Sequence, residues 1–429
     1  MKVSNVLVFP AGTEIAFEIN KALRDSRFIK LFGATSVACH AEMMFDRCVK
    51  NLPYADDPAV ISALNECIDH FGIDYVYPAH DSALLKLTLE QDNLNAKVVT
   101  SDANTVWICR SKNRTYKYLY AKGADYLPRF YESIDDITEW PVFIKPAVGQ
   151  GSEGAVKINS SRVLRVMLKQ GIEYAICEYL PGDEVTVDCF TDRHGTLRYV
   201  GQRSRERIRS GIAVRSRTLP LEDEVKEIAE DLNRNFRFNG AWFFQLKQDR
   251  CGRWKLMEVA PRIAGTMGLT RNLGINMPLL TMYNMWGVDV EILNNKNQLL
   301  LDRAFISRFK SGIEYDKVFI DFDDTLIQDG RVNPLLMAFL YQAKSKGKEL
   351  NLITKHNGSI RTKLLMHNID PAMFNYIIDL PATREKSDYV KGSAVFIDDS
   401  FSERKKVFDT CGVPVFDIDA VESLLDWSA

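Results

Sequence analysis

The sequence predicts a chain of mixed α/β and α+β architecture that is built from three consecutive parts. Short apolar strands alternate with amphipathic helices over residues 1–105, a pattern typical of a doubly wound parallel sheet. Longer strands with glycines and paired charges follow over residues 106–311 and favour antiparallel pairing. A second strand-and-helix series covers residues 312–429. Because 429 residues are too many for one compact core, we expect these three parts to be separate domains.

The composition is that of an ordinary globular protein, with 46% apolar residues, 26% charged residues and a formal net charge of −2. This near-neutral balance gives no general argument for nucleic-acid binding. No apolar run is long enough for a membrane-spanning helix, and the first nine residues resemble a β-strand more than a secretion signal. The cysteines are scattered without a Cys-x-x-Cys pair, which favours reduced thiols. We therefore expect a cytoplasmic protein with neither a nucleic-acid nor a membrane partner.

The first part shows its strands and helices clearly. We expect strands at residues 3–9, 30–33, 75–78 and 97–99, and helices through residues 15–23 and 59–71. The turn after the first strand, Pro10-Ala-Gly12, matches the G-x-G-x-x-G fingerprint of dinucleotide-binding turns poorly. A nicotinamide site is therefore not expected there.

The middle part contains five elements in a fixed order. A helix begins at Ser111-Lys112, and a strand over residues 140–146 ends in Lys145-Pro146. A glycine-rich loop follows at residues 149–154, where closely spaced amides can form a nest for an anion. The fourth element covers residues 175–188, and the fifth is a pair of strands around residues 244–247 and 255–262. These two strands would place Gln245 beside Glu258, and oxygen ligands of this kind suit Mg²⁺.

The order and spacing of these five elements resemble the ATP-grasp superfamily, in particular its carbamoyl-phosphate-synthase-like members, over roughly residues 1–310. The resemblance implies a Rossmann-like pre-ATP-grasp domain, then an ATP-grasp domain that joins a small-molecule carboxylate to an amine through an acyl phosphate. Its cofactors would be ATP and Mg²⁺, with the metal on Gln245 and Glu258, and Arg262 would stabilise the transferring phosphoryl group. The ATP contacts implied are Lys112, Lys145, Gly151 and Ser152 at the phosphates, Glu178, Tyr179 and Leu180 at the adenine, and Glu184 at the ribose.

Two positions depart from the pattern of that superfamily. The usual Glu-x-Asn metal pair is Glu258-Val-Ala260 in this chain, and alanine cannot bind a metal. Gln245 is a neutral ligand where a carboxylate is common. Both changes lower the negative charge available to the metal. They motivate an alternative, in which the ATP-binding part is regulatory or weakly catalytic.

The strongest local charge feature is the arginine-rich segment over residues 203–217. Arginines alternate at positions 203, 205, 207 and 209, so we expect one strand with these side chains on one face, and a turn that brings Arg215 and Arg217 back. A solvated edge strand would explain them. So would an anion site for a carboxylate or phosphorylated substrate. Its place between the fourth and fifth elements favours the anion site, with Arg203, Arg205, Arg207 and Arg215 as its candidates.

The last part opens with a buried strand followed by two carboxylates, Asp321 and Asp323, spaced to lie on one face. A second strand ends in Thr354, and Lys386 precedes a third strand that ends in Asp398-Asp399. Lys391 is a rival for the role of Lys386. The order of these motifs resembles the haloacid dehalogenase superfamily of phosphoryl-transfer enzymes. Intervals of about 30 residues between motifs leave room for only a minimal cap domain.

These residue types predict a phosphatase mechanism. Asp321 is the candidate nucleophile that forms an aspartyl phosphate, and Asp323 is the candidate acid and base. Thr354 and Lys386 would bind phosphoryl oxygens. The carboxylates Asp321, Asp323, Asp398 and Asp399 are the candidate Mg²⁺ ligands.

The favoured hypothesis is therefore a bifunctional enzyme, in which the phosphatase acts on a phosphorylated metabolite of the ligase pathway. A non-catalytic scaffold is a third hypothesis, and a homodimer is an open alternative to a monomer.

Overall fold

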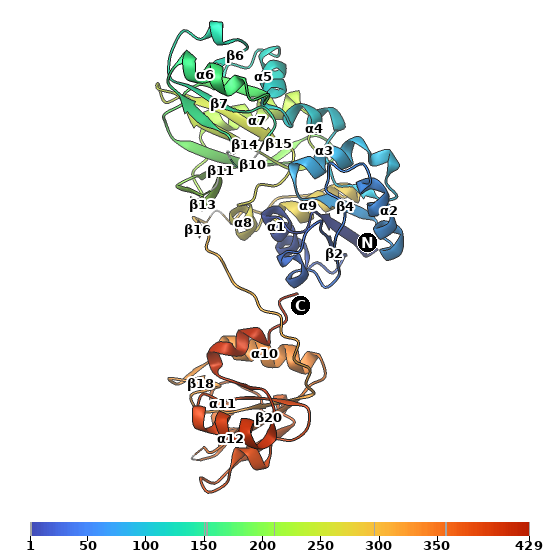
Figure 1. Cartoon of the computed structure of the whole chain (residues 1–429), viewed down its shortest axis with the longest axis vertical. Coiled ribbons are helices and arrows are strands. Elements are labelled where there is room, and N and C mark those ends of the chain that lie inside the picture. The colour runs from blue at the N-terminus through green and yellow to red at the C-terminus, as the bar shows by residue number, and fades with distance from the viewer. Residues whose placement is uncertain are drawn as a thin grey trace. The chain divides into compact units, whose positions relative to one another are not determined.

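The computed structural model describes residues 2–149, 151, 153–209, 211–295, 297–356 and 358–428. The chain divides into two compact units, Met1–Phe305 and Ile306–Ala429. Figure 1 shows the first unit in blue to yellow and the second in orange to red. No helix within the described residues is long and apolar enough to cross a membrane.

The first unit begins with the predicted doubly wound sheet. Its five strands are all parallel, in the order β3-β2-β1-β4-β5. Their bounds are β1 Ser4–Phe9, β2 Ile29–Ala34, β3 Cys48–Val49, β4 Tyr75–Pro78 and β5 Lys97–Val98. The helices between them are α1 Glu14–Leu23, α2 Val60–Phe71 and α3 Asp81–Leu89. Alternate residues of β1 serve opposite faces: Val6 and Val8 belong to one apolar core, Leu7 and Phe9 to another.

One face of this sheet is completed by residues far along the sequence. Helices α8 (Gly268–Asn272) and α9 (Met277–Met285) follow strand β15 (Trp254–Ala260). Met277 and Met282 pack in the same core as Val6, Val8 and Ile19. Figure 1 shows α9, in yellow, among the blue elements. The N-terminal sheet and the region after it thus share a core within one unit.

The rest of the first unit consists of antiparallel sheets, as expected. One has the order β11-β10-β14-β15, with β10 Glu184–Thr191, β11 Leu197–Ser204, β14 Gly240–Gln248 and β15 Trp254–Ala260. The second has the order β6-β9-β7-β8, with β6 Phe130–Tyr131, β7 Val142–Pro146, β8 Val156–Ile158 and β9 Tyr174–Glu178. The third joins β12 Arg207–Arg209, β13 Ile212–Arg217 and β16 Leu300–Asp302. The helices are α4 Ala103–Cys109, α5 Lys112–Tyr120, α6 Ser161–Leu168 and α7 Asp223–Asn235.

The second unit has a parallel five-stranded sheet in the order β21-β20-β17-β22-β23, which matches the predicted second series. Its strands are β17 Lys317–Ile320, β20 Glu349–Thr354, β21 Tyr376–Asp379, β22 Ala394–Ile397 and β23 Val415–Phe416. A short hairpin, β18 Ile327–Gln328 and β19 Arg331–Val332, follows β17. The helices are α10 Pro334–Ser345, α11 Ile360–Met366 and α12 Phe401–Cys411, with a 3-10 turn η5 at Lys386–Asp388.

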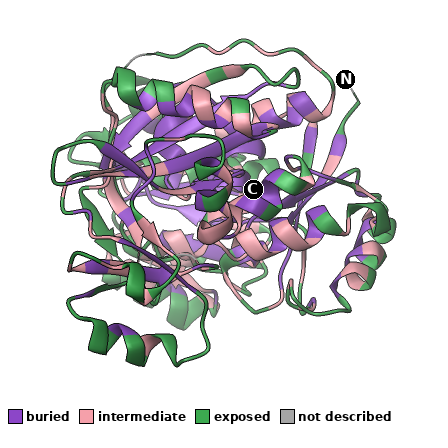
Figure 2. Ribbon diagram, turned by 90° about the horizontal axis from the view of Figure 1, so that it is seen from above, coloured by how far each residue is buried: buried purple, intermediate pink, exposed green. Residues whose placement is uncertain are grey.

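The central strands of both parallel sheets are almost completely buried. Every residue of β4 and β22 is buried, and all of β17 except its first residue. Figure 2 shows central strands in purple and helices that carry pink and green on their outer faces. Parallel strands covered on both faces need continuous apolar runs, which these segments have. The carboxyl ends of β17, β20 and β22 therefore meet at one edge, where the polar motifs begin.

Candidate active sites

Two adjoining pockets lie within the first unit. One has a volume of about 160 Å³ and is called the nucleotide pocket after the ligand predicted for its residues. The other has a volume of about 250 Å³ and is called the acceptor pocket after the carboxylate expected of such a ligase. The two share nine lining residues, among them Lys112, Gly151, Gln245 and Glu258. Two reactants held in these pockets would meet where the shared residues lie.

The nucleotide pocket contains nearly all the residues that the sequence assigned to ATP. The structure brings together Lys112, Lys145, Gly151, Glu178, Tyr179, Leu180, Glu184, Gln245 and Glu258. Ser152 lies outside the described residues. Apolar groups such as Pro128, Phe143 and Met257 complete the lining, as a planar base requires. The individual roles of these residues remain predictions.

Lys145 donates a hydrogen bond to the carbonyl of Met257, which a β-bulge leaves outside the strand pairing. Gln245 pairs with Glu258 across β14 and β15, but Leu246 pairs with Leu256, so Met257 has no partner in the ladder. The Met257 carbonyl accepts hydrogen bonds from Lys145 Nζ at 2.7 Å and from the Tyr116 hydroxyl at 2.9 Å. Burial lowers the pKa of Lys145 to about 8. The result is a fixed ammonium group beside the pocket.

The predicted metal ligands Gln245 and Glu258 lie directly opposite each other on neighbouring strands, as expected. Ala260 lies two residues beyond Glu258 and is buried, so it adds no ligand. Among the described residues, no group of three or more carboxylates, histidines or cysteines gathers here. One carboxylate and one amide fit a Mg²⁺ ion that also takes oxygens from a triphosphate, and they would not form a complete protein cage.

Glu184 is fixed between two cations. One carboxylate oxygen lies 2.6 Å from Arg205 Nε, and the other lies 3.2 Å from Lys247 Nζ. All three residues line the nucleotide pocket. Glu178 is also held, because one of its carboxylate oxygens accepts from the Arg129 amide at 2.8 Å. Both glutamates are thus oriented before any ligand binds.

Arg262 occupies the acceptor pocket together with Asp81, at the start of α3. Its Nε and Nη2 donate to the two carboxylate oxygens of Asp81 at 2.6 and 2.5 Å. Although burial opposes it, this pairing lowers the pKa of Asp81 to about 2. The paired Arg262 therefore joins the loop after β15 to the start of α3. Its predicted contact with a phosphoryl group stays a prediction.

The arginine-rich segment differs from the single strand that the sequence predicted. Strand β11 ends at Ser204, and β12 begins at Arg207 in another sheet, so the alternate arginines do not share one strand face. Arg203 is buried in an ion pair with Asp188 at 2.8 Å. Arg207 and Arg215 both pair with Asp302. Of the four candidates for an anion site, only Arg203 and Arg205 line the acceptor pocket.

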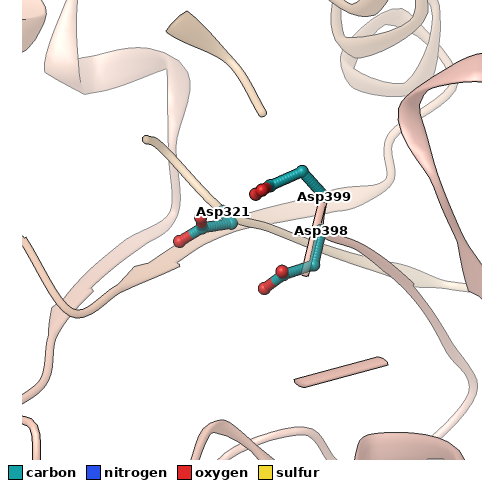
Figure 3. Close-up of side chains that lie close together, drawn as sticks. All are labelled: Asp321, Asp398 and Asp399. Carbon is teal, nitrogen blue, oxygen red and sulfur yellow. The ribbon is translucent and has the colours of Figure 1, made fainter. Parts of the chain in front are cut away.

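The second unit gathers three carboxylates at the edge of its parallel sheet. Oxygens of Asp321, Asp398 and Asp399 lie within 4.8 Å of one another. Figure 3 shows Asp398 and Asp399 at consecutive positions after β22, beside Asp321 from the end of β17. The predicted Lys386 is buried, and its Nζ lies 2.7 Å from Asp321 Oδ1 and 2.6 Å from Asp398 Oδ2. The rival Lys391 is exposed.

Charge in this site is concentrated and partly neutralised. Burial raises the pKa of Asp398 to about 6 even though Lys386 acts against the rise. Burial also raises the pKa of Asp321. Burial alone would lower the pKa of Lys386, but the two carboxylates raise it above its usual value. Three oxygen donors of this kind fit a divalent cation such as Mg²⁺.

Asp323, which the sequence also predicted as a metal ligand, is not placed in this group by the structure. Strand β17 ends at Ile320, so Asp321 and Asp323 follow it in the loop and do not alternate along a strand. The Asp323 carboxylate instead lies 2.7 Å from Nδ1 of His356. Thr354 is buried at the end of β20, as expected.

Sequence reasoning missed several residues of both sites. Tyr116 and Lys247 line the nucleotide pocket, and His356 faces Asp323. Thr325 donates to an Asp399 oxygen at 2.9 Å, and Arg404 donates to the carbonyls of Asp398 and Asp399 at 2.6 and 2.7 Å. Arg404 stands six residues after Asp398, on the first turn of α12, and that spacing was the one available signal. The others depend on contacts between distant segments.

Comparison with known proteins identifies the fold of the first unit. A family model described as ATP-grasp in the biosynthetic pathway with Ter operon matches residues 173–304. The chain is similar to N5-carboxyaminoimidazole synthetase from Staphylococcus aureus complexed with ADP, with 14% identity, a TM-score of 0.58, and 70% of this chain and 82% of that chain covered. No curated protein matches the chain.

Two further structures share this architecture. The biotin carboxylase domain dimer of Hydrogenobacter thermophilus 2-oxoglutarate carboxylase, in complex with MgADP, ADP and bicarbonate, is 14% identical, with a TM-score of 0.58 and 70% of this chain and 74% of that chain covered. L-amino acid ligase from Bacillus licheniformis is 19% identical, with a TM-score of 0.52 and coverage of 66% and 74%. The first unit therefore has the fold of these structures, and within it residues 173–304 match the ATP-grasp family model. None of these comparisons supports the expected resemblance of the second unit to the haloacid dehalogenase superfamily.

Proposed function

We propose that the first unit is an ATP-dependent carboxylate–amine ligase that forms ADP. The observation that carries this proposal is the pair of adjoining pockets, which share Lys112, Gly151, Gln245 and Glu258. A nucleotide in one pocket would present its terminal phosphate to a carboxylate in the other. The similar structures with ADP and the L-amino acid ligase support the same class of reaction.

The residues suggest a division of tasks. Lys112 and Lys145 donate hydrogen bonds to phosphate oxygens, and Glu184 accepts them from ribose hydroxyls. Gln245 and Glu258 would hold Mg²⁺, which neutralises phosphate charge when bound. The acceptor carboxylate takes the terminal phosphoryl group and ADP leaves. An amine then attacks the acyl carbon and releases phosphate.

The test is ADP formation by the full chain with a panel of carboxylates and amines, followed by mass detection of the product. Lys145→Met should lower turnover by about 100-fold or more, since a fixed charge that meets the phosphates is lost. Lys226→Met, which removes an exposed lysine on α7, is the matched control. Tight ATP binding without ADP formation in any combination would instead favour the regulatory alternative.

For the second unit we propose a Mg²⁺-dependent phosphatase. The observation that favours it is Lys386, held between Asp321 and Asp398 beside Asp399. Asp321 would attack the phosphorus and displace the alcohol, to which Asp323 donates a proton. Water would then hydrolyse the aspartyl phosphate and give a proton back to Asp323, whose carboxylate His356 holds. The three clustered carboxylates would hold Mg²⁺, which offsets repulsion between the nucleophile and its anionic substrate.

Hydrolysis of p-nitrophenyl phosphate with Mg²⁺ and without ATP tests this proposal. Asp321→Asn should abolish hydrolysis, because an amide cannot act as the nucleophile. Asp316→Asn removes an exposed carboxylate just before β17, at the strand end opposite Asp321, and should leave hydrolysis unchanged. Equal rates of hydrolysis for wild type and Asp321→Asn would contradict the proposal. A natural substrate would be a phosphorylated metabolite that is processed before or after the ligation.

A further inference from the structure

Residues 299–303, which include strand β16, contact elements that form three walls of the acceptor pocket. The pocket is lined by the start of α1 (Thr13–Ile15), by the loop at Gly265–Thr266, and by the β12–β13 hairpin at Gly211–Ala213. These three walls come from segments widely separated in the sequence. Residues 299–303 form hydrogen bonds or ion pairs with the elements that carry all three. We call this segment the strap.

The strap is fixed to the hairpin by both backbone and side chains. Strand β16 pairs antiparallel with β13, with Asp302 opposite Arg215. The Thr218 amide donates to the Leu299 carbonyl at 3.0 Å, and the Arg303 amide donates to the Val214 carbonyl at 2.7 Å. These contacts cover the edge of β13 that would otherwise have unpaired backbone groups.

Asp302 removes a repulsion that the hairpin alone would contain. Arg207 and Arg215 are direct cross-strand neighbours on β12 and β13. Like charges in this position destabilise a strand pair. The two carboxylate oxygens of Asp302 pair with one arginine each, one with Arg207 and the other with Arg215. Docking of the strap therefore stabilises the β12–β13 hairpin.

Arg303 connects the strap to the other two walls. Its Nη2 donates to the Gly265 carbonyl and lies 3.4 Å from a carboxylate oxygen of Glu18 on α1. The side chains of Arg303 and Glu18 are only 20% and 9% exposed, so this contact is shielded from salt and water. One guanidinium thus links the N-terminal domain to the loop that lines the pocket.

We propose that the strap sets the shape of the acceptor pocket, with Asp302 and Arg303 as positioning residues for the acceptor. This proposal rests on the ligase function proposed above. Among the residues of these three walls, Gly211 alone also lines the nucleotide pocket. Because the strap holds walls that belong almost entirely to the acceptor pocket, loosening it should weaken acceptor binding more than nucleotide binding.

Amide hydrogen exchange on the full chain tests the strap without any ligand. Arg303→Met and Asp302→Asn should speed exchange by about 10-fold or more in residues 211–218 and 264–266, and leave β1 and β4 unchanged. Arg193→Met, which breaks an exposed pair with Asp289, is the control and should change neither region. Unchanged exchange in residues 211–218 would overturn the proposal, and so would equal acceleration throughout the first unit.

Kinetics with the carboxylate and amine found by the substrate screen provides the second measurement. Arg303→Met should raise KM for the acceptor by about 10-fold while KM for ATP stays within about threefold. Arg303→Lys, which keeps the charge, should recover part of the loss. Equal increases of both KM values would contradict a positioning role. If wild type forms no ADP, the ligase proposal fails, and hydrogen exchange alone decides whether the strap holds the walls.

Discussion

Lys145 shows what burial does to a single side chain. Its side chain is buried, yet its ammonium group keeps two hydrogen-bond acceptors, the Met257 carbonyl and the Tyr116 hydroxyl. Burial lowers its pKa to about 8, with Lys112 acting in the same direction. The lysine is thus charged at neutral pH, but its protonated form is less favoured than that of an exposed lysine. A bound phosphate would favour the protonated form again, because the opposite charge raises the lysine pKa.

We predict that ATP affinity falls as pH rises through about 8, because the neutral amine cannot pair with a phosphate oxygen. Titration of ATP binding between about pH 7 and 9.5 measures this effect, since the unperturbed lysine pKa is about 10.4. Lys145→Arg is the matched variant, because arginine stays charged over the whole range. A wild-type affinity that is flat across this range would contradict the prediction.

The Asp81–Arg262 pair gives a second prediction at this scale. We expect Asp81→Asn to lower the free energy of unfolding by about 3–5 kcal/mol at neutral pH, because it leaves a buried guanidinium without its counter-charge. Urea denaturation measures the loss. Asp289→Asn, which alters an exposed pair, should change stability little.

The sign of the pH effect follows from the lowered pKa of Asp81. Its value in the folded protein is about 2, below the usual value for an unfolded chain. The carboxylate therefore contributes stability above about pH 4, and this contribution is lost as pH falls through about 2. The difference between wild type and Asp81→Asn should shrink in that acid range. A difference that stays constant would show that the ion pair is not its source.

At the scale of elements, an irregularity in β15 builds the nucleotide pocket. A regular strand would use the Met257 carbonyl in the sheet ladder, whereas the bulge leaves it free for Lys145 and Tyr116. The same bulge sits next to the Gln245–Glu258 pair. Bulges often re-aim side chains beside active sites, and this one brings the candidate metal and phosphate ligands together.

We predict that Tyr116→Phe costs about 0.5–1.5 kcal/mol of stability and also weakens ATP binding, because Lys145 loses one of its two fixed partners. Tyr118→Phe is the matched control. Its hydroxyl donates to the Asn235 carbonyl at 2.8 Å, outside both pockets. Unfolding and ATP titration on both variants test the idea. Equal ATP affinity in the two would show that Tyr116 has only a structural role.

At the scale of the whole molecule, the chain consists of two compact units, each with its own core. We predict two calorimetric transitions. A non-hydrolysable ATP analogue with Mg²⁺ should raise the midpoint temperature of the first unit's transition only. At an analogue concentration of 100 times Kd, the free energy of unfolding of that unit should rise by about 2.7 kcal/mol. Asp81→Asn identifies that transition, because Asp81 lies in the first unit. One cooperative transition that shifts as a whole would contradict the prediction.

The order of strands and helices, and most of the polar residues at their ends, could be predicted from the sequence. Apolar runs and helical spacing are local signals, and parallel strands present their carboxyl ends at one edge whatever lies elsewhere. Gln245 and Glu258 were expected opposite each other on two neighbouring strands. Asp321, Asp398 and Asp399 were expected where parallel strands end, with Lys386 in the same site. The structure agrees with both expectations.

The partners of charged groups could be decided only by the tertiary structure. Arg207 and Arg215 belong to Asp302, Arg262 belongs to Asp81, and Asp323 faces His356. Each partner stands far away in the sequence, and local periodicity carries no information about such pairs. The bulge at Met257 and the strap at residues 299–303 depend in the same way on how strands register against each other. The sequence by itself determined which chemistry is present, and only long-range packing decided which groups remain free to use it.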